Sequence, residues 1–168
     1  MSVQIRPPRP GDGEGMARVW FSAGAYYADL DPALFQVPSA DGLAESFEAD
    51  IEARSTDTGS LRLVAERDSA VTGCLSAHVE YPVASIAHQL VRELGWIRLM
   101  VDALVVDQAL WRQGTGTALL EAAESWGRGR DASMVRLDTY AHGPVAVPFY
   151  EQHMGYRRRS IYFAKGLG

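Results

Sequence analysis

The sequence predicts a mixed α/β fold in which helices flank a single sheet. Segments that alternate like strands and segments with apolar residues at helical spacing occur in the order strand, helices, strands, helix, strand, helix, strand. The chain has 168 residues, 47% of them hydrophobic, an ordinary size and composition for one domain. We therefore expect a single domain over residues 1–168, with a core that needs neither a disulfide nor a structural metal.

The first quarter of the chain predicts an edge strand and two helices. Residues 2–6 alternate polar and apolar side chains and stop at a Pro-Pro pair, as expected for a short edge strand. Apolar residues at helical spacing predict a helix from about residue 11 to 29 and a second over residues 41–54. The two apolar faces are formed by Met16, Val19, Trp20, Ala23 and Tyr27, and by Leu43, Phe47 and Ile51.

The middle of the chain predicts a hairpin, a helix and a buried strand. Residues 61–67 and 71–81 are strand-like and are joined by a short polar turn, which is typical of a hairpin. An amphipathic helix over residues 83–94 is predicted by the apolar stripe of Val83, Ile86, Leu90 and Leu94. Residues 96–106 are the most apolar strand-like run, as expected for a strand covered on both faces.

The last part of the chain predicts two helices and two strands. A glycine-rich turn at residues 114–116 leads into an amphipathic helix through Trp126, and a strand over residues 133–140 follows. A short helix that contains a proline then runs to Met154 and is capped by Gly155. Residues 156–165 predict a final strand.

Charge and apolar runs exclude several classes of protein. The net charge is -5, and it divides into an acidic half, residues 1–84, and a mildly basic half, residues 85–168. This pattern is not typical of a nucleic-acid-binding protein. No apolar run approaches the roughly 20 residues of a membrane span, and the N-terminus has no apolar signal core, so we expect a cytoplasmic protein without a membrane partner.

Cysteine and histidine offer little chemistry. The single cysteine, Cys74, lies inside a predicted strand beside a glycine and is expected to be a small core residue. The four histidines show no spacing typical of metal ligands, so no metal site is predicted.

A Gly-x-Gly sequence at the start of a helix predicts an anion site. Gly114 and Gly116 follow the apolar strand, and backbone amides at a helix N-terminus attract anions such as pyrophosphate. Arg112 can pair with a phosphate, and Thr115 and Thr117 can add hydroxyl donors. The same glycines can also form a tight turn that packs a helix closely, and both interpretations stay open at this point.

Two familiar nucleotide motifs do not fit this turn. A Walker loop requires a lysine directly after its last glycine, and the only lysine of the chain is Lys165. A dinucleotide-binding turn requires a third glycine where this chain has Leu119. Such a turn also follows the first strand of its fold, whereas the turn here lies late in the chain. Neither fold is predicted.

Two blocks of the sequence resemble the GNAT superfamily of acyl-CoA-dependent N-acyltransferases. Residues 111–116, Trp-Arg-Gln-Gly-Thr-Gly, are similar to the family's Gln/Arg-x-x-Gly-x-Gly/Ala, with Trp111 in place of the first Gln or Arg. Residues 146–156 are similar to its Ala-x-x-Phe-Tyr-x-x-x-Gly-Phe/Tyr block. Gly143 stands where many members have asparagine, and Pro148 interrupts the expected helix.

The resemblance implies a fold, a donor and a donor site. The fold would be a central mixed, largely antiparallel sheet of about six to seven strands flanked by about four helices. The donor would be acetyl-CoA, with its pantetheine arm on the backbone of Leu104, Val105 and Val106. Its pyrophosphate would be held by Arg112, Gln113, Gly114, Thr115, Gly116 and Thr117.

Catalytic candidates follow from the chemistry of acyl transfer to an amine, which needs a base near the amine and an acid near the departing sulfur. Tyr150 matches the family tyrosine that often serves as the acid. Asp102 is the first candidate for the base, because a carboxylate inside an apolar strand is costly unless it has a task or a partner, and Arg98 is a possible partner. Glu80, at the end of the preceding strand, is the alternative base.

The acceptor is expected to be a small amine or a peptide amine, attacked directly in a ternary complex. A protein that binds acyl-CoA for regulation and has no working acid and base is the alternative. Residues 81–95 form an insertion that could cover the acceptor or join two copies of the chain, and the final strand could also pair with a second copy, so a homodimer is possible.

Overall fold

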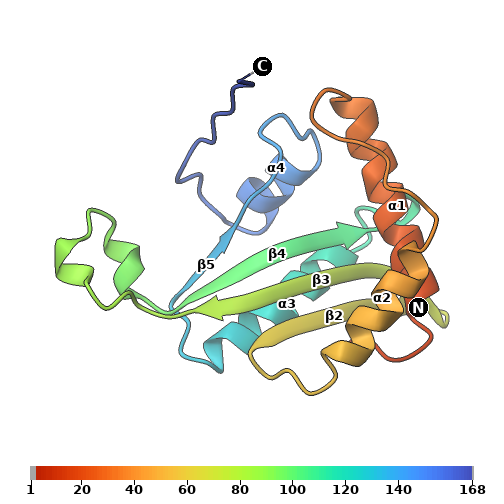
Figure 1. Cartoon of the computed structure of the whole chain (residues 1–168), viewed down its shortest axis with the longest axis horizontal. Helices are drawn as coiled ribbons and strands as arrows, with labels where there is room; N and C mark the ends of the chain where they lie inside the picture. The colour runs from red at the N-terminus through yellow and green to blue at the C-terminus, as the bar shows by residue number, and fades with distance from the viewer. Residues whose placement is uncertain (1–2, 168) are drawn as a thin grey trace. The chain divides into compact units, whose positions relative to one another are not determined.

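The computed structural model describes residues 3–167, which form a five-stranded sheet with helices on both faces (Figure 1). The chain divides into two compact units, Met1–Asp138 and Thr139–Gly168. The first unit holds the whole sheet and the helices packed on it, and each unit is described by itself below.

The sheet follows the order of the chain. Its strands are β1 (Gln4–Arg6), β2 (Ser60–Arg67), β3 (Ala70–Glu80), β4 (Arg98–Val106) and β5 (Met134–Leu137), in the order β1-β2-β3-β4-β5. The first four strands pair antiparallel, and β5 is parallel to β4. A parallel neighbour needs a crossover, and α3 (Thr115–Arg128) supplies it. The predicted mixed, largely antiparallel sheet is confirmed, with fewer strands than the predicted six to seven.

Helices α1 (Gly13–Leu30) and α2 (Leu43–Ala53) cover one face of the sheet. The core between helices and sheet contains Met16, Val19, Ile51, Val64, Val71 and Cys74, with Phe47 and Val105 packed against it. Met16, Val19, Phe47 and Ile51 of the predicted stripes therefore face the sheet. Trp20 does not, because it is 38% exposed and its ring meets Phe47 edge-on. Cys74 is buried in this core, and burial raises the pKa of its thiol to about 12.

Helix α3 packs on the opposite face, where two glycines allow a close approach (Figure 1). A Cβ at Gly73 of β3 would lie 3.1 Å from Leu119 Cδ1 and 3.3 Å from Thr115 Cγ2. At the other end of α3, a Cβ at Gly127 would lie 3.0 Å from Leu99 Cδ2. Because successive strand residues point to opposite faces, Gly73 meets α3 while its neighbour Cys74 enters the core under α1 and α2.

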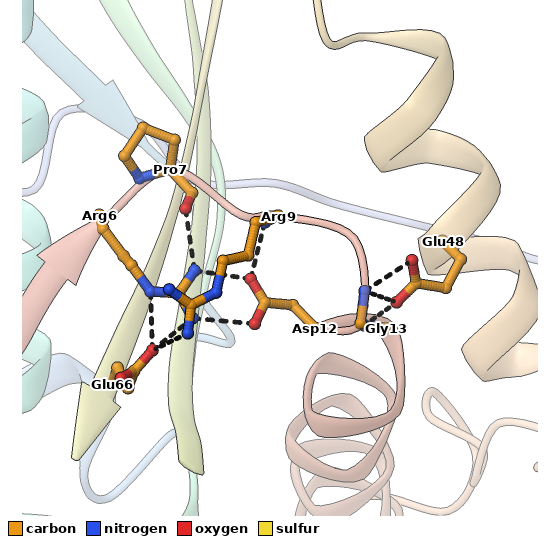
Figure 2. A network of polar contacts seen from close by, with 8 residues as sticks. Arg6, Pro7, Arg9, Asp12, Gly13, Glu48 and Glu66 are labelled. Carbon is orange, nitrogen blue, oxygen red and sulfur yellow. Dashed lines mark hydrogen bonds and ion pairs between the residues drawn. The ribbon is translucent and has the colours of Figure 1, made fainter. Parts of the chain in front are cut away.

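A buried ionic network joins β1, β2 and the start of α1 (Figure 2). The Arg6 guanidinium donates to both Asp12 oxygens, at 2.6 and 2.9 Å, and to Glu66 at 2.7 Å. Glu48 of α2 accepts from the backbone amides of Gly11 and Gly13, the latter at 2.6 Å, and so caps the N-terminus of α1. A carboxylate at this end of a helix also interacts favourably with the helix dipole.

The segment between β3 and β4 does not form the predicted helix. It contains two short 3₁₀ helices, Ile86–His88 and Arg92–Gly95, and its ends are joined by a hydrogen bond from Val83 N to Leu94 O at 3.0 Å. The predicted stripe is not buried as a whole, since Leu90 is fully exposed and Ile86 is 38% exposed, and helices of this length depend on packing. Figure 1 shows the segment projecting beyond the end of the sheet.

The second unit begins with a short helix and continues as an extended segment. Residues Ala146–Pro148 form one α-helical turn, and Phe149–His153 continue it as a π-helical turn closed by Met154 N to Phe149 O at 3.0 Å. Gly155, at φ +75°, ends the helix as predicted.

The predicted strand over residues 156–165 is wrong, because no strand is assigned there. Ile161, Tyr162 and Phe163 are largely exposed, so this segment lacks the packing that would hold an apolar strand. The predicted strand over residues 133–140 is confirmed in shorter form as β5.

No helix within residues 3–167 is long and apolar enough to cross a membrane. Residue 2, part of the predicted first strand, lies outside the described residues.

Candidate functional site

The N-terminus of α3 has no side-chain cap among the described residues. Gly114 occupies the N-cap in a left-handed conformation, at φ +84°. The first-turn amides of an uncapped helix need an acceptor from outside the helix. The geometry therefore fits the predicted phosphate site.

The side chains of the loop before α3 have different tasks. Gln113 accepts a hydrogen bond from Arg67 at 2.6 Å, which ties the loop to the end of β2. Arg112 is exposed at φ +60° and is free to meet an anion. Thr115 is 1% exposed, and its buried hydroxyl has no hydrogen-bond partner among the described residues.

Trp111 anchors this loop. Its indole Nε1–H donates to Val106 O at 2.9 Å, and its ring meets Tyr26 of α1 edge-on, with 4.7 Å between centroids. Burial, and to a lesser degree the neighbouring Tyr27, raises the pKa of Tyr26. The tryptophan that departs from the family pattern therefore holds the loop before α3 against β4 on one side and α1 on the other.

Strand β4 separates from β5 halfway along its length. The two strands pair only from Arg98–Met134 to Val101–Leu137, where β5 ends. The pairing of β4 with β3 shifts at the same place, since Ser76 opposes Ala103 and Ala77 opposes Val101. Asp102 is thus the extra residue of a β-bulge, and bulges often occur beside functional sites. Beyond it, Leu104, Val105 and Val106 have no ladder partner on the β5 side within the described sheet.

Replacing Gly114 by alanine tests the anion site. The left-handed conformation disfavours a Cβ, so we expect a loss of about 1 kcal/mol in stability and at least a threefold weaker affinity for CoA, because the amides of the first turn move. The control is Gly42→Ala, since Gly42 is also a left-handed N-cap, at φ +73°, with open space around it. Calorimetric titration of CoA should show weaker binding for the first variant only; equal affinities would contradict the site.

Four polar residues gather where β3 and β4 pair. Asp102 lies 3.0 Å from His78 Nδ1, and His78 Nε2 lies 3.9 Å from Glu80 Oε1. Glu80 Oε2 in turn lies 3.0 Å from the Arg98 guanidinium. The side chains of His78, Glu80 and Asp102 are 41%, 43% and 48% exposed, whereas Arg98 is 4% exposed. We call these four residues the carboxylate–histidine cluster.

The cluster differs from the sequence expectation in two ways. Asp102 is exposed and not buried, because the bulge turns it away from the apolar strand. Its partner is His78, while Arg98 pairs with Glu80. The spacing of the four histidines gives no signal for His78, because it lacks a metal-ligand pattern. No metal-binding group of three or more such side chains is found in the described chain. The register of β3 and β4, which puts His78 opposite Met100, brings it close to Asp102.

Tyr150 lies in the second unit, in the π-helical turn. Its ring meets Phe149 and Tyr156 edge-on, with 5.1 and 5.9 Å between centroids, and its carbonyl accepts from Tyr156 N at 2.8 Å. Pro148 has no amide hydrogen, which favours the irregular helix around this tyrosine. The short helix therefore holds Tyr150 in a defined aromatic group.

Several solved structures share this fold. They include a mutant of the BH1408 protein from Bacillus halodurans (TM-score 0.79, 20% identity, covering 98% of this chain and 99% of that chain). Glucosamine-6-phosphate N-acetyltransferase from Arabidopsis thaliana has a TM-score of 0.69 at 18% identity, with both chains covered fully. The aminoglycoside N-acetyltransferase AAC(6')-Iy, in complex with CoA, has a TM-score of 0.62 at 16% identity and covers 98% of this chain and 95% of that chain.

Sequence comparison gives the family. No curated protein matches the chain significantly. The model of the acetyltransferase (GNAT) family matches residues 25–156, well over half of the chain, and that stretch includes the separated half of β4, the turn before α3 and Tyr150. The chain belongs to the GNAT acetyltransferase family.

Proposed function

We propose that the protein moves an acetyl group from acetyl-CoA to a primary amine, by direct attack within a ternary complex. The observation that carries the proposal is the separation of β4 from β5 in a strand that leads into the uncapped N-terminus of α3. A chain of backbone groups followed by an anion site suits an extended donor with a pyrophosphate. We also propose that both compact units belong to one domain, residues 1–168, because the family model spans both.

The donor would be held mainly by backbone groups. Leu104, Val105 and Val106 offer amides and carbonyls beyond the end of β5, although the Val106 carbonyl already accepts from Trp111. The phosphates would lie at residues 112–117, with Arg112 as the cation and the first turn of α3 as the amide donor. The thioester supplies an activated acyl group, so the protein has to place an amine, remove its proton and protonate the sulfur.

The carboxylate–histidine cluster is the proposed receiver of the amine proton. It is exposed, it carries two carboxylates on neighbouring strands, and it begins at the bulge where β5 leaves β4. Asp102 and Glu80 attract an ammonium group and stabilise positive charge beside it. Tyr150 is the proposed acid for the departing thiolate, since a phenol with a pKa near 10 can share its proton with a thiolate whose conjugate acid has a pKa near 8.5.

The acceptor is proposed to be a small amine or a peptide amine. Two proteins of the same fold are named for amino sugars, glucosamine-6-phosphate and aminoglycosides, so amino sugars belong in the first test.

The experiment is release of CoA from acetyl-CoA in the presence of amino sugars, polyamines, amino acids and short peptides. We expect turnover with at least one amine and a large loss in the Asp102→Asn variant, because the cluster then lacks a carboxylate at the bulge. Tight binding of acetyl-CoA without turnover on any amine would contradict the enzyme and favour an acyl-CoA-binding module.

A further inference from the structure

The imidazole of His78 lies between the two carboxylates of the carboxylate–histidine cluster. Nδ1 is 3.0 Å from Asp102, and Nε2 is 3.9 Å from Glu80 Oε1, beyond hydrogen-bond distance. We propose that Nε2 of His78 is the atom that takes the proton from the acceptor amine, and that Asp102 is a positioning residue for the ring. This inference rests on the proposed function, and it names the base within the same site.

Asp102 determines which nitrogen can act. An ionised carboxylate only accepts hydrogen bonds, so Nδ1 is the donor in this pair. In the neutral ring the proton then resides on Nδ1, and Nε2 keeps its lone pair. With 41% of the His78 side chain exposed, that lone pair is open to an incoming amine.

Glu80 and Arg98 have a different task. The Arg98 side chain is 4% exposed, and Glu80 Oε2, 3.0 Å away, is its counterion. A buried cation needs this partner, so the carboxylate of Glu80 is committed to an ion pair and is a poor proton acceptor. Its second oxygen still faces Nε2, where it can stabilise an imidazolium once His78 has taken a proton.

Imidazole also suits the reaction better than a carboxylate does. A general base is most effective when its pKa lies near the working pH, and the ordinary value is about 6.5 for histidine and about 4 for aspartate or glutamate. Asp102 and Glu80, one on each strand of the pair, stabilise the charged ring on both sides.

The proposed step is balanced as follows. The amine nitrogen forms a bond to the thioester carbonyl carbon while one of its protons passes to His78 Nε2. The carbon–sulfur bond breaks, and the sulfur leaves with the electron pair and takes a proton from the acid. The products are the amide and free CoA; His78 gives its proton to solvent, and the acid regains one from solvent.

The test uses the full chain and an amine on which the wild type is active. We expect His78→Gln to lower kcat about a hundredfold with CoA affinity and melting temperature unchanged. We expect His78→Ala to regain activity with added imidazole, because the vacated space opens to solvent. The control is His142→Gln, whose histidine is exposed and meets the ring of Tyr140 edge-on.

Asp102 is tested by its effect on the same step. Asp102→Asn should lower kcat with little change in KM, and Asp102→Glu should restore part of it, because a carboxylate can again accept from Nδ1. A kcat for His78→Gln within threefold of the wild type would overturn the inference while the enzyme itself stood. Failure of the wild type on every amine would overturn the proposed function and this inference together.

Discussion

Asp12→Asn should lower the free energy of unfolding by about 2–3 kcal/mol at pH 7, because it removes one anion from a largely buried ionic network and leaves Glu66 as the remaining carboxylate partner of Arg6. Burial by itself would raise the pKa of Asp12. Hydrogen bonds from the Arg6 guanidinium and the Arg9 amide, with the positive charge of Arg6, outweigh burial and lower that pKa. The charged form is therefore the one that the fold stabilises.

The sign of the pH dependence follows from the lowered pKa. The contribution of Asp12 is complete above the unfolded value of about 4 and is lost as the pH falls through the folded value. Urea unfolding of wild type and variant from pH 7 to pH 2.5 should show two curves that approach each other below about pH 4. A loss of equal size at every pH would refute this account.

The control for Asp12 is Asp50→Asn. Asp50 also pairs with arginines, 2.7 Å from Arg54 and 3.0 Å from Arg62, but these pairs are more exposed. Partly exposed ion pairs contribute roughly 0–1 kcal/mol, so this variant should lose far less stability than Asp12→Asn.

Tyr150→Phe should lower kcat about a hundredfold or more if Tyr150 is the acid that protonates the departing thiolate. The substitution removes only the hydroxyl and keeps the ring that meets Phe149 and Tyr156. We therefore expect an intact fold and unchanged CoA affinity. The defect should shrink with a donor whose leaving thiol has a lower pKa, because such a thiolate needs less help from an acid.

Tyr156→Phe is the matched control, since Tyr156 lies in the same aromatic group. This variant should retain most of the activity of the wild type. Released CoA can be measured with a thiol reagent, because the only cysteine of the chain, Cys74, is buried with a raised pKa and reacts slowly in the folded protein. Equal activity of the Tyr150→Phe variant and the wild type would remove Tyr150 from the mechanism.

The elements with one clear apolar face could be predicted from the sequence. Met16 and Val19 of α1 and Phe47 and Ile51 of α2 pack against the sheet. The strands β2 and β3 pair as a hairpin at the predicted polar turn. Val83 and Leu90 show the same spacing without a helix, since periodicity describes a face but not whether a partner exists to cover it.

The candidate site could be predicted only in part. The turn at Gly114 carries a local signal, because a glycine N-cap is visible in the sequence. The pairing of His78 with Asp102 depends on a bulge that shifts the register of β3 and β4 by one residue. The sequence around Asp102 contains no signal for this bulge. Long-range register was the missing information.

The close packing of α3 on β3 has a consequence for the evolution of this sequence. A glycine in the middle of a strand normally weakens it, yet Gly73 is where Leu119 of α3 approaches the sheet. A Cβ at position 73 would also lie 3.1 Å from the Val105 carbonyl, so a larger side chain needs a small shift of the β4 backbone as well as a smaller residue at position 119 or an outward move of the helix. Among natural relatives, these two positions should therefore covary, although 45 residues separate them in the chain.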